Sequence, residues 1–297
     1  MKVSFYERIS ENKNKTLLLF SFFIVFIILL GWLFGEIFGI GFLGTFIAFI
    51  LAIIFAFFSY YNSDKIVLRI SGAREATKQE FPYYYNIVDA LAIAAGIPAP
   101  KKYIIESNAM NAFATGRDPQ HSAICVTTGL LKKLNRAEIE GVIAHEISHI
   151  VNYDIRTMMY AAVMVGFIVM MSDFVLRYFW YFGNGRREGR DTFGLIMLII
   201  GILAAILAPI IAQLIKLAIS RQREFLADAT AAKLTRYPEG LASALEKIAM
   251  DPNVLETASN ATAHLFIANP FKDKNWLHNL FSTHPPIEER IKRLRRM

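Results

Sequence analysis

The chain has one cysteine, Cys125, among 297 residues. An internal disulfide is therefore excluded, and a single free thiol is typical of a protein that folds in a reducing compartment. Internal repeats and low-complexity tracts are also absent from the sequence, which excludes a repeat architecture. Charge is scarce: 19% of the residues are charged, whereas 55% are apolar. Soluble globular chains usually have a smaller apolar fraction.

The apolar residues are concentrated in four blocks. They cover residues 16–34, 37–61, 158–182 and 193–219. The first two blocks have almost no charge and are each about as long as a bilayer core requires, so they predict two transmembrane helices. A cleaved signal peptide is the alternative for the first block, but its apolar run is too long and no small-residue cleavage site follows it.

The third and fourth blocks are less uniform. Asp173 and Arg177 interrupt the third block one helical turn apart, where they can pair with each other. The connection at residues 183–191 carries three arginines, which disfavours an external loop. These two blocks therefore predict either a second spanning hairpin or one that lies partly within the protein.

Basic residues flank the first two blocks, whereas the turn between the blocks holds only Glu36. The flanking residues are Lys2, Arg8, Lys13 and Lys15 on one side and Lys65, Arg69, Arg74 and Lys78 on the other. Because cytoplasmic loops are enriched in lysine and arginine, both chain termini and the following segment are predicted to face the cytoplasm. The net charge of +7 comes with no compact nucleic-acid recognition motif. The sequence therefore predicts the lipid bilayer, and no nucleic acid, as a partner.

Residues 65–156 have an ordinary soluble composition. Asn135 followed by Glu138 has the form of an N-cap with its capping-box partner, which predicts the start of a helix. Short strands, rich in residues that favour sheets, are predicted at residues 102–106, 112–115 and 122–127. Other helices are predicted at residues 82–95, 220–235, 238–250 and 285–296.

The helix that starts after Asn135 carries the sequence His145-Glu146-Ile147-Ser148-His149. Histidines four residues apart project from the same face of a helix, so both rings can bind one zinc ion. Glu146 lies beside that ion without binding it, and its carboxylate can accept a proton from metal-bound water. Zinc lowers the pKa of such water toward about 7 and polarises a scissile carbonyl. The motif predicts peptide hydrolysis with one Zn2+ per chain as cofactor.

A hydrolytic zinc site needs a third protein ligand and an open fourth position. Glu224 is the favoured candidate because it lies on a predicted helix just beyond the fourth hydrophobic block. Asp228 follows one turn later and can accept a hydrogen bond from the far ring nitrogen of a zinc-bound histidine. The alternative is an exposed helix face on which Arg221 and Arg223 pair with these carboxylates. An even number of membrane crossings would return Glu224 to the side of His149.

Four motifs together resemble the HtpX-type heat-shock membrane proteases, which are gluzincins related to the prenylated-protein (CAAX) endopeptidases. The motifs are the capped His-Glu-Ile-Ser-His helix, Ser-Arg-Gln-Arg-Glu-Phe-Leu-Ala-Asp at residues 220–228, Asn-Ala-Phe at residues 111–113 and Thr-His-Pro-Pro at residues 283–286. The resemblance covers nearly the whole chain. It implies an integral inner-membrane, stress-response protease that acts in quality control on misfolded or damaged membrane proteins.

The resemblance also assigns roles to individual residues. His145, His149 and Glu224 match the family's zinc ligands, Glu146 matches its catalytic base, and Asp228 matches a position that supports the ligands. These assignments agree with the roles that the residue types themselves suggest.

Substrate contacts are implied by the same resemblance. Asn111 and Ala112 lie in a segment that in the family pairs with extended substrate backbone above the zinc; ordinary strand and turn chemistry is the alternative. His284 is expected to stabilise the oxyanion of the tetrahedral intermediate, unless it caps or packs at the start of the last helix. Arg290 belongs to the region from which relatives place a histidine or arginine near the zinc.

We therefore predict a mainly α membrane protein, with a gluzincin-like zinc peptidase domain, a small β-sheet and up to four transmembrane helices. Residues 1–64 would form an N-terminal transmembrane hairpin. Residues 65–297 would form the peptidase domain, interrupted by a hydrophobic hairpin at about 157–219. Two alternatives are a CAAX-type prenyl-protein endopeptidase, which typically has more spans, and an inactive scaffold, whose structural zinc would normally have four protein ligands.

Overall fold

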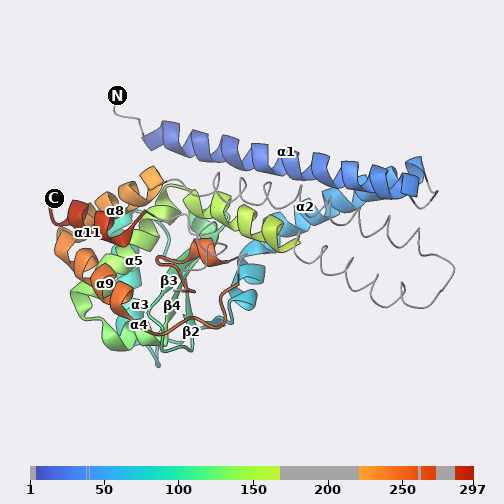
Figure 1. The fold of residues 1–297 in the computed structure, drawn as a ribbon. Helices are drawn as coiled ribbons and strands as arrows, with labels where there is room; N and C mark the ends of the chain where they lie inside the picture. The colour runs from blue at the N-terminus through green and yellow to red at the C-terminus, as the bar shows by residue number, and fades with distance from the viewer. Residues whose placement is uncertain (1–4, 38, 40, 168–220, 260–261, 272–284) are drawn as a thin grey trace.

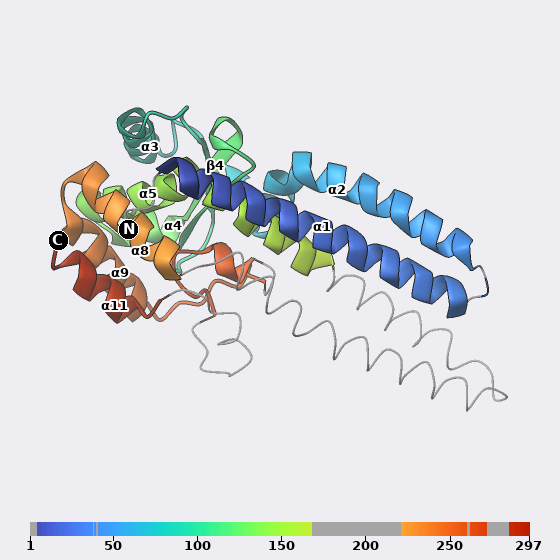
Figure 2. The same cartoon turned by 90° about the horizontal axis from the view of Figure 1, so that it is seen from above.

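The computed structural model describes residues 5–37, 39, 41–167, 221–259, 262–271 and 285–297. Two helices, α1 (Phe5–Ile37) and α2 (Phe42–Ile70), form a long antiparallel hairpin. The hairpin projects from a body that contains the sheet and the other labelled helices (Figures 1 and 2). The second helix continues six residues beyond the predicted end of the hairpin at residue 64, and the division into domains stays a prediction.

Close packing joins the two helices of the hairpin. A Cβ atom at Gly31 would overlap the Cβ of Ala48, so only glycine fits at this point. Contacts between small residues are typical of helix pairs in membranes, because they allow the backbones to approach. The hairpin is thus held by short-range packing as well as by its turn.

Membrane spans are only partly visible from helix length and hydropathy. Within the described ranges, no single helix is both long enough and apolar enough to cross a membrane. Phe42–Phe55 and Phe57–Ile70 together satisfy both criteria across a 51° bend. Thr16–Leu29 is a shorter apolar helix. The two predicted transmembrane helices therefore stay a prediction. The fourth hydrophobic block, and the third from residue 168 onward, lie outside the described residues, as do Asp173 and Arg177.

Four strands form one mixed sheet, which confirms the predicted small sheet. The strands β1 (Arg74–Glu75), β2 (Lys101–Ile105), β3 (Ala112–Gly116) and β4 (Ser122–Thr127) lie in the order β1-β2-β4-β3. The β2–β4 pairing is parallel and the other two are antiparallel. An edge strand leaves backbone groups available for pairing, and β3 lies at such an edge.

The central helix of the body is α5 (Arg136–Val151), which follows the short helix α4 (Thr128–Lys133). The predicted capping box is present: Asn135 Oδ1 accepts from the Glu138 N–H at 3.0 Å, and the Glu138 carboxylate accepts from the Asn135 N–H at 2.8 Å. Every residue from Gly141 to Ile150 is buried. A helix this deeply buried holds its polar side chains away from bulk water, so they need partners inside the protein.

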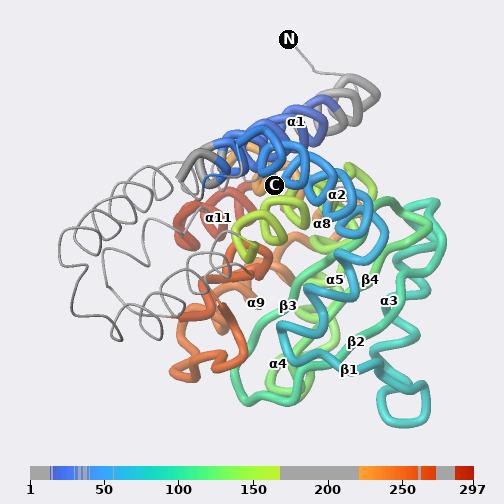
Figure 3. Tube along the Cα trace, turned by 90° about the vertical axis from the view of Figure 1, so that its right-hand side faces the viewer, coloured from blue at the N-terminus to red at the C-terminus, as the bar shows by residue number. Residues whose placement is uncertain are grey.

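Several elements surround α5. Figure 3 shows it in the middle of the body, among the sheet and helices α3, α8 and α9. The surrounding helices are α3 (Pro82–Ala95), α8 (Arg221–Thr235), α9 (Pro238–Met250) and α11 (Ile287–Leu294), and two 3-10 helices are η1 (Pro119–His121) and η2 (Ala263–Leu265). The predicted bounds hold for α3 and α9 and, over the described residues, for α8, whereas α11 is shorter than predicted.

A further helix at residues 154–167 leaves the body along the hairpin. The hydroxyls of Thr157 and Thr16 lie 3.3 Å apart. Farther along, the ring centroid of Phe167 lies 5.4 Å from that of Phe23. The start of the third hydrophobic block therefore packs against the hairpin of α1 and α2.

Candidate metal centre

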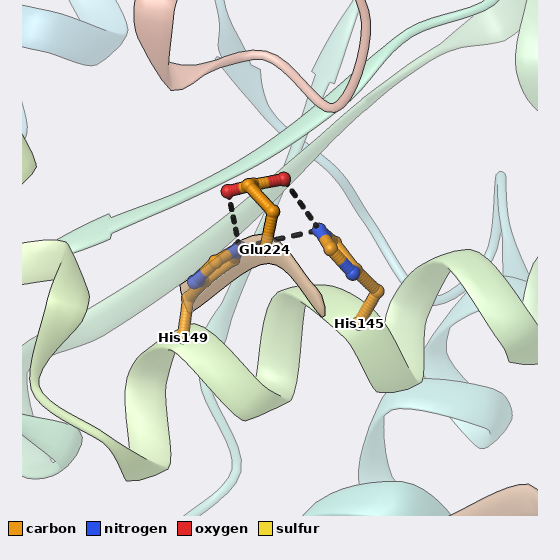
Figure 4. Close-up of side chains that lie close together, drawn as sticks. All are labelled: His145, His149 and Glu224. Atoms are coloured by element: carbon orange, nitrogen blue, oxygen red, sulfur yellow. Dashed lines mark hydrogen bonds and ion pairs between the residues drawn. The ribbon is translucent and has the colours of Figure 1, made fainter. Parts of the chain in front are cut away.

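Three side chains from two helices meet inside the body (Figure 4). His145 and His149 project from successive turns of α5, and Glu224 comes from the first turn of α8. His145 Nε2 lies 3.2 Å from His149 Nε2 and 3.7 Å from Glu224 Oε2. Glu224 Oε1 lies 3.4 Å from His149 Nε2. All three side chains are buried.

These separations fit one tetrahedral metal ion. Two ligand atoms that are each about 2.0–2.1 Å from zinc, at a tetrahedral angle, lie roughly 3.3–3.4 Å apart. One ligand atom from each of the three residues lies within 4.8 Å of the others. No other group of this kind occurs in the part of the chain that the structure describes. Two imidazoles and a carboxylate are suitable ligands for zinc, and the protein supplies three, as a catalytic site requires.

Burial and nearby charge affect the two histidines differently. Burial lowers the pKa of His145 to about 4, so its ring is neutral at pH 7. Burial also acts to lower the pKa of His149, but Asp154 and Glu224 raise it to about 9. Since a metal binds neutral imidazole, it must displace a proton from His149.

The Glu146 carboxylate lies between α5 and the edge strand β3. Burial raises the pKa of Glu146 to about 7, although the backbone N–H of Ala114 in β3 acts to lower it. Glu146 Oε1 is buried and has no hydrogen-bond partner among the described residues. Buried polar atoms are normally paired. A carboxylate with a free oxygen and a pKa near neutrality is suited to hold a water and accept its proton.

A buried ion pair lies behind His145. Asp228 Oδ1 is 3.0 Å from His145 Nδ1. The Arg290 guanidinium donates to both Asp228 oxygens, at 2.9 Å from Nε and 2.7 Å from Nη2. Burial acts to raise the pKa of Asp228, but Arg290 and His145 hold it well below its usual range. Asp228 therefore stays ionised and can accept the Nδ1–H, which leaves Nε2 for a metal.

Arg290 is fully buried. Besides its bonds to Asp228, it donates from Nη1 to the carbonyl of Ile267 at 3.0 Å and lies 3.6 Å from Glu224 Oε2. Burial acts to lower the pKa of Arg290, but Asp228 raises it above the ordinary value for arginine, so the guanidinium stays charged. Arg290 thus contacts both Glu224, the third candidate ligand, and Asp228, the partner of His145.

Asn111 immediately precedes β3 and Ala112 is its first residue, and both contact another part of the chain. Asn111 Nδ2 donates to the Ala268 carbonyl at 3.0 Å, and the Ala112 carbonyl accepts from the Ile267 N–H at 2.9 Å. Their contact with substrate stays a prediction. His284 lies outside the described residues.

Two groups at the candidate site could not be identified from the sequence motifs. Asp154 Oδ2 lies 3.1 Å from His149 Nδ1, and an acidic residue about one turn beyond the second histidine was the signal available for it. Ala114 contributes a backbone N–H to Glu146, and a backbone group cannot be predicted from the residue type. Sequence spacing finds side chains on one helix but does not find a strand that lies across it.

The fold and the site together define a metalloprotease. A buried His-Glu-x-x-His helix holds two potential metal ligands, a carboxylate from a distant helix completes the set, and the glutamate of the motif lies beside it with a free oxygen.

Comparison with known proteins identifies the family. The profile described as peptidase family M48 matches residues 78–297. Two proteins described as Protease HtpX homolog, from Dictyoglomus thermophilum and Dictyoglomus turgidum, are 50% and 51% identical over 99% of this chain and 95% of their own length. A third, from Streptococcus gordonii, is 45% identical over 98% of this chain and 99% of its own. The chain therefore belongs to peptidase family M48, among its HtpX-type proteases, as the motifs predicted.

A solved structure of another protein also matches this chain. The crystal structure of Ste24p from S. mikatae aligns with a TM-score of 0.47 and 20% sequence identity. The alignment covers 94% of this chain and 64% of the Ste24p chain, so this chain spans less than two thirds of that structure.

Proposed function

We propose that this metalloprotease is a zinc endopeptidase, embedded in the cell inner membrane, that hydrolyses misfolded or damaged membrane proteins at the cytoplasmic face. The observation that carries the proposal is the meeting of His145, His149 and Glu224 at tetrahedral ligand distances, beside the free oxygen of Glu146. The quality-control substrates rest on the resemblance to heat-shock proteases.

Each side chain of the site has a separate role in the proposed peptide hydrolysis. Zinc held by the three ligands would supply a Lewis acid and a water of lowered pKa. Glu146 accepts a proton from the attacking water and passes it to the leaving amine nitrogen. Asp228 fixes the tautomer and orientation of His145, and Arg290 holds Asp228 in place. His284 is proposed to stabilise the oxyanion.

Strand β3 is the proposed substrate edge. Ala112 and Asn111 fix the start of the strand, and Ala114 lies next to the carboxylate of Glu146. Pairing of backbone groups does not depend on side-chain identity, so a substrate strand added to β3 would allow cleavage of many sequences. This tolerance suits an enzyme that acts on unfolded segments.

Exposed apolar side chains on α1 and α2 support embedding in a bilayer. They include Leu17, Leu18, Phe22, Val25, Leu29 and Trp32 on α1, and Phe42, Leu43, Phe46, Ile50, Ile54 and Phe57 on α2. Soluble monomers rarely expose contiguous apolar surfaces of this extent. The basic residues at both ends of the hairpin favour a cytoplasmic location for the termini and the site.

The mechanism is tested by Glu146→Gln in full-length protein purified in detergent. We expect casein cleavage with added zinc to be lost, because glutamine cannot accept the proton, while zinc stays bound. Wild-type activity in this variant would rule out the proposed base. A wild-type protein that binds zinc but cleaves nothing would favour the scaffold, and cleavage confined to prenylated peptides would favour a CAAX-type enzyme.

The ligand set is tested by metal content. Glu224→Ala is expected to lose bound zinc as completely as His149→Ala, because two ligands alone hold the ion weakly. Glu239→Ala, which removes an exposed carboxylate paired with Arg295, is the control and should keep one zinc per chain. One zinc per chain in Glu224→Ala would show that another residue supplies the third ligand.

A further inference from the structure

A second aspartate contacts the metal site, on the side of His149. Asp154 Oδ2 lies 3.1 Å from His149 Nδ1, and its side chain is 3% exposed. Asp228 makes the equivalent contact with the Nδ1 of His145, at a distance of 3.0 Å. Each imidazole thus directs Nε2 to the proposed metal and Nδ1 to its own buried carboxylate.

Asp154 is itself contacted by an arginine. Arg223 Nε lies 3.6 Å from Asp154 Oδ1, and the Arg223 side chain is 13% exposed. Arg223 immediately precedes Glu224 in α8. The Asp154–Arg223 pair therefore connects the chain just after the second histidine with the helical turn that presents the third ligand. A buried pair of this kind resists reorientation, because separating the partners leaves an uncompensated charge.

The backbone before Asp154 adopts an unusual conformation. Helix α5 ends at Val151, and Tyr153 has a φ of +59°. In the left-handed region the Cβ atom crowds the following carbonyl oxygen, so a bulky residue is seldom found there. The turn makes Asp154 the first residue of the helix at 154–167 and directs its carboxylate back to His149. Strain that persists beside a site is an indication of a constraint imposed by function.

We infer that Asp154 is a positioning residue for the metal ligand His149, held by Arg223 and placed by the left-handed turn at Tyr153. The carboxylate accepts the Nδ1–H of His149, so the Nε2 lone pair points to the metal. The inference rests on the proposed zinc site and adds a residue to it. Asp154 begins the helix at 154–167 and Arg223 lies in the first turn of α8, so the described residues on both sides of residues 168–220 meet at the proposed metal ligands.

Zinc affinity of the full-length protein in detergent tests the inference. With a chromophoric chelator as competitor, we expect Asp154→Ala to weaken zinc binding about 10- to 100-fold, the usual effect of removing such a hydrogen-bond partner. Asp154→Asn, which keeps the shape and loses the charge, should fall between Asp154→Ala and wild type. Asp89→Asn, at an aspartate of α3 that pairs with Lys102 of β2, is the matched control and should bind zinc as wild type does.

Cobalt in place of zinc provides a second measurement. A changed orientation of His149 should alter the visible absorption of cobalt-saturated Asp154→Ala relative to wild type. A lower unfolding temperature with unchanged zinc affinity and an unchanged cobalt spectrum would overturn the inference, because Asp154 would then serve folding alone. If wild type binds neither metal, the proposed function itself fails, which is a separate outcome.

The turn is tested by two substitutions that both remove the tyrosine ring. Glycine adopts a positive φ freely, whereas valine, branched at Cβ, strongly disfavours it. Tyr153→Gly should therefore keep wild-type zinc affinity, and Tyr153→Val should approach Asp154→Ala. Equal affinities in the two variants would contradict the role given to the turn.

Discussion

At the residue scale, the candidate metal ligands are surrounded by paired buried charges. His145 contacts Asp228, which Arg290 holds, and His149 contacts Asp154. A buried charge is costly unless a partner compensates it, so each carboxylate here has a cation or an imidazole N–H within reach. The two histidines nevertheless differ in protonation, because burial dominates at His145 and the carboxylates dominate at His149.

This difference predicts proton release on metal binding. With a pKa of about 9, His149 carries a proton at pH 6 in the metal-free protein, whereas His145, with a pKa of about 4, does not. Zinc should therefore displace about one proton at pH 6, and apparent affinity should rise about tenfold per pH unit up to about 9. Calorimetry in buffers of different ionisation enthalpy measures the release.

Glu146→Gln is the background for that experiment, because it removes the other nearby group that titrates close to neutrality. At pH 6 a metal-bound water with a pKa near 7 stays mostly protonated, so it adds little. A binding enthalpy that is independent of the buffer would show that His149 is already neutral before the metal binds.

At the element scale, the site depends on how closely α8 and α9 pack against α5. A Cβ atom at Gly141 of α5 would lie 2.6 Å from the backbone nitrogen of Leu241, and one at Gly240 of α9 would lie 2.5 Å from the Ala137 carbonyl oxygen. Two glycines therefore permit contact between the helix backbones. Because α8 runs into α9, this contact also fixes the helix that carries Glu224.

Replacing Gly141 tests that contact. Alanine gains roughly 0.8–1.0 kcal/mol of helix propensity over glycine, but the new methyl group meets backbone atoms of Leu241, and overpacking typically costs about 1–3 kcal/mol. The packing effect should prevail, so Gly141→Ala is expected to lower the thermal unfolding midpoint in detergent and to weaken zinc binding. A raised midpoint would show that α9 can move away at little cost.

At the scale of the whole molecule, a long apolar hairpin is attached to a body that contains the site (Figures 1 and 2). The turn of the hairpin lies far from the body, whereas α1 begins at the end of the hairpin nearer the body. If the hairpin crosses a bilayer, its turn and the body must be on opposite sides. For that topology, the charge pattern predicts that the body faces the cytoplasm.

Cysteine labelling tests this topology. Phe42, next to the hairpin turn, and Ile93, in α3 of the body, are both 81% exposed, so Phe42→Cys and Ile93→Cys are matched probes. In intact bacterial cells, a membrane-impermeant maleimide should label Phe42→Cys only, and lysis should make Ile93→Cys reactive. The native Cys125 is buried, so wild type serves as the blank. Labelling of Ile93→Cys in intact cells would reverse the proposed orientation.

Much of the site could be predicted from the sequence because its signals are local. The spacing of His145 and His149 fixes two ligands on one helical face, and the Asn135–Glu138 box fixes where that helix starts. Strands β2, β3 and β4 and helix α3 also follow from short-range patterns, whereas the two-residue strand β1 was not predicted. The full burial of Arg290 and its two bonds to Asp228 could not be predicted, since they depend on how the last helix packs against α8.

The sequence alone determined the His-Glu-x-x-His motif, with the carboxylate proposed as its base, and the family, because each depends on residue types at fixed spacings along the chain. Only the tertiary structure decided that Glu224 joins the two histidines, that Asp154 and Asp228 each contact one of them, and that β3 lies over Glu146. These contacts join segments that are brought together by packing around α5, and such packing depends on the shapes of all the surrounding elements at once.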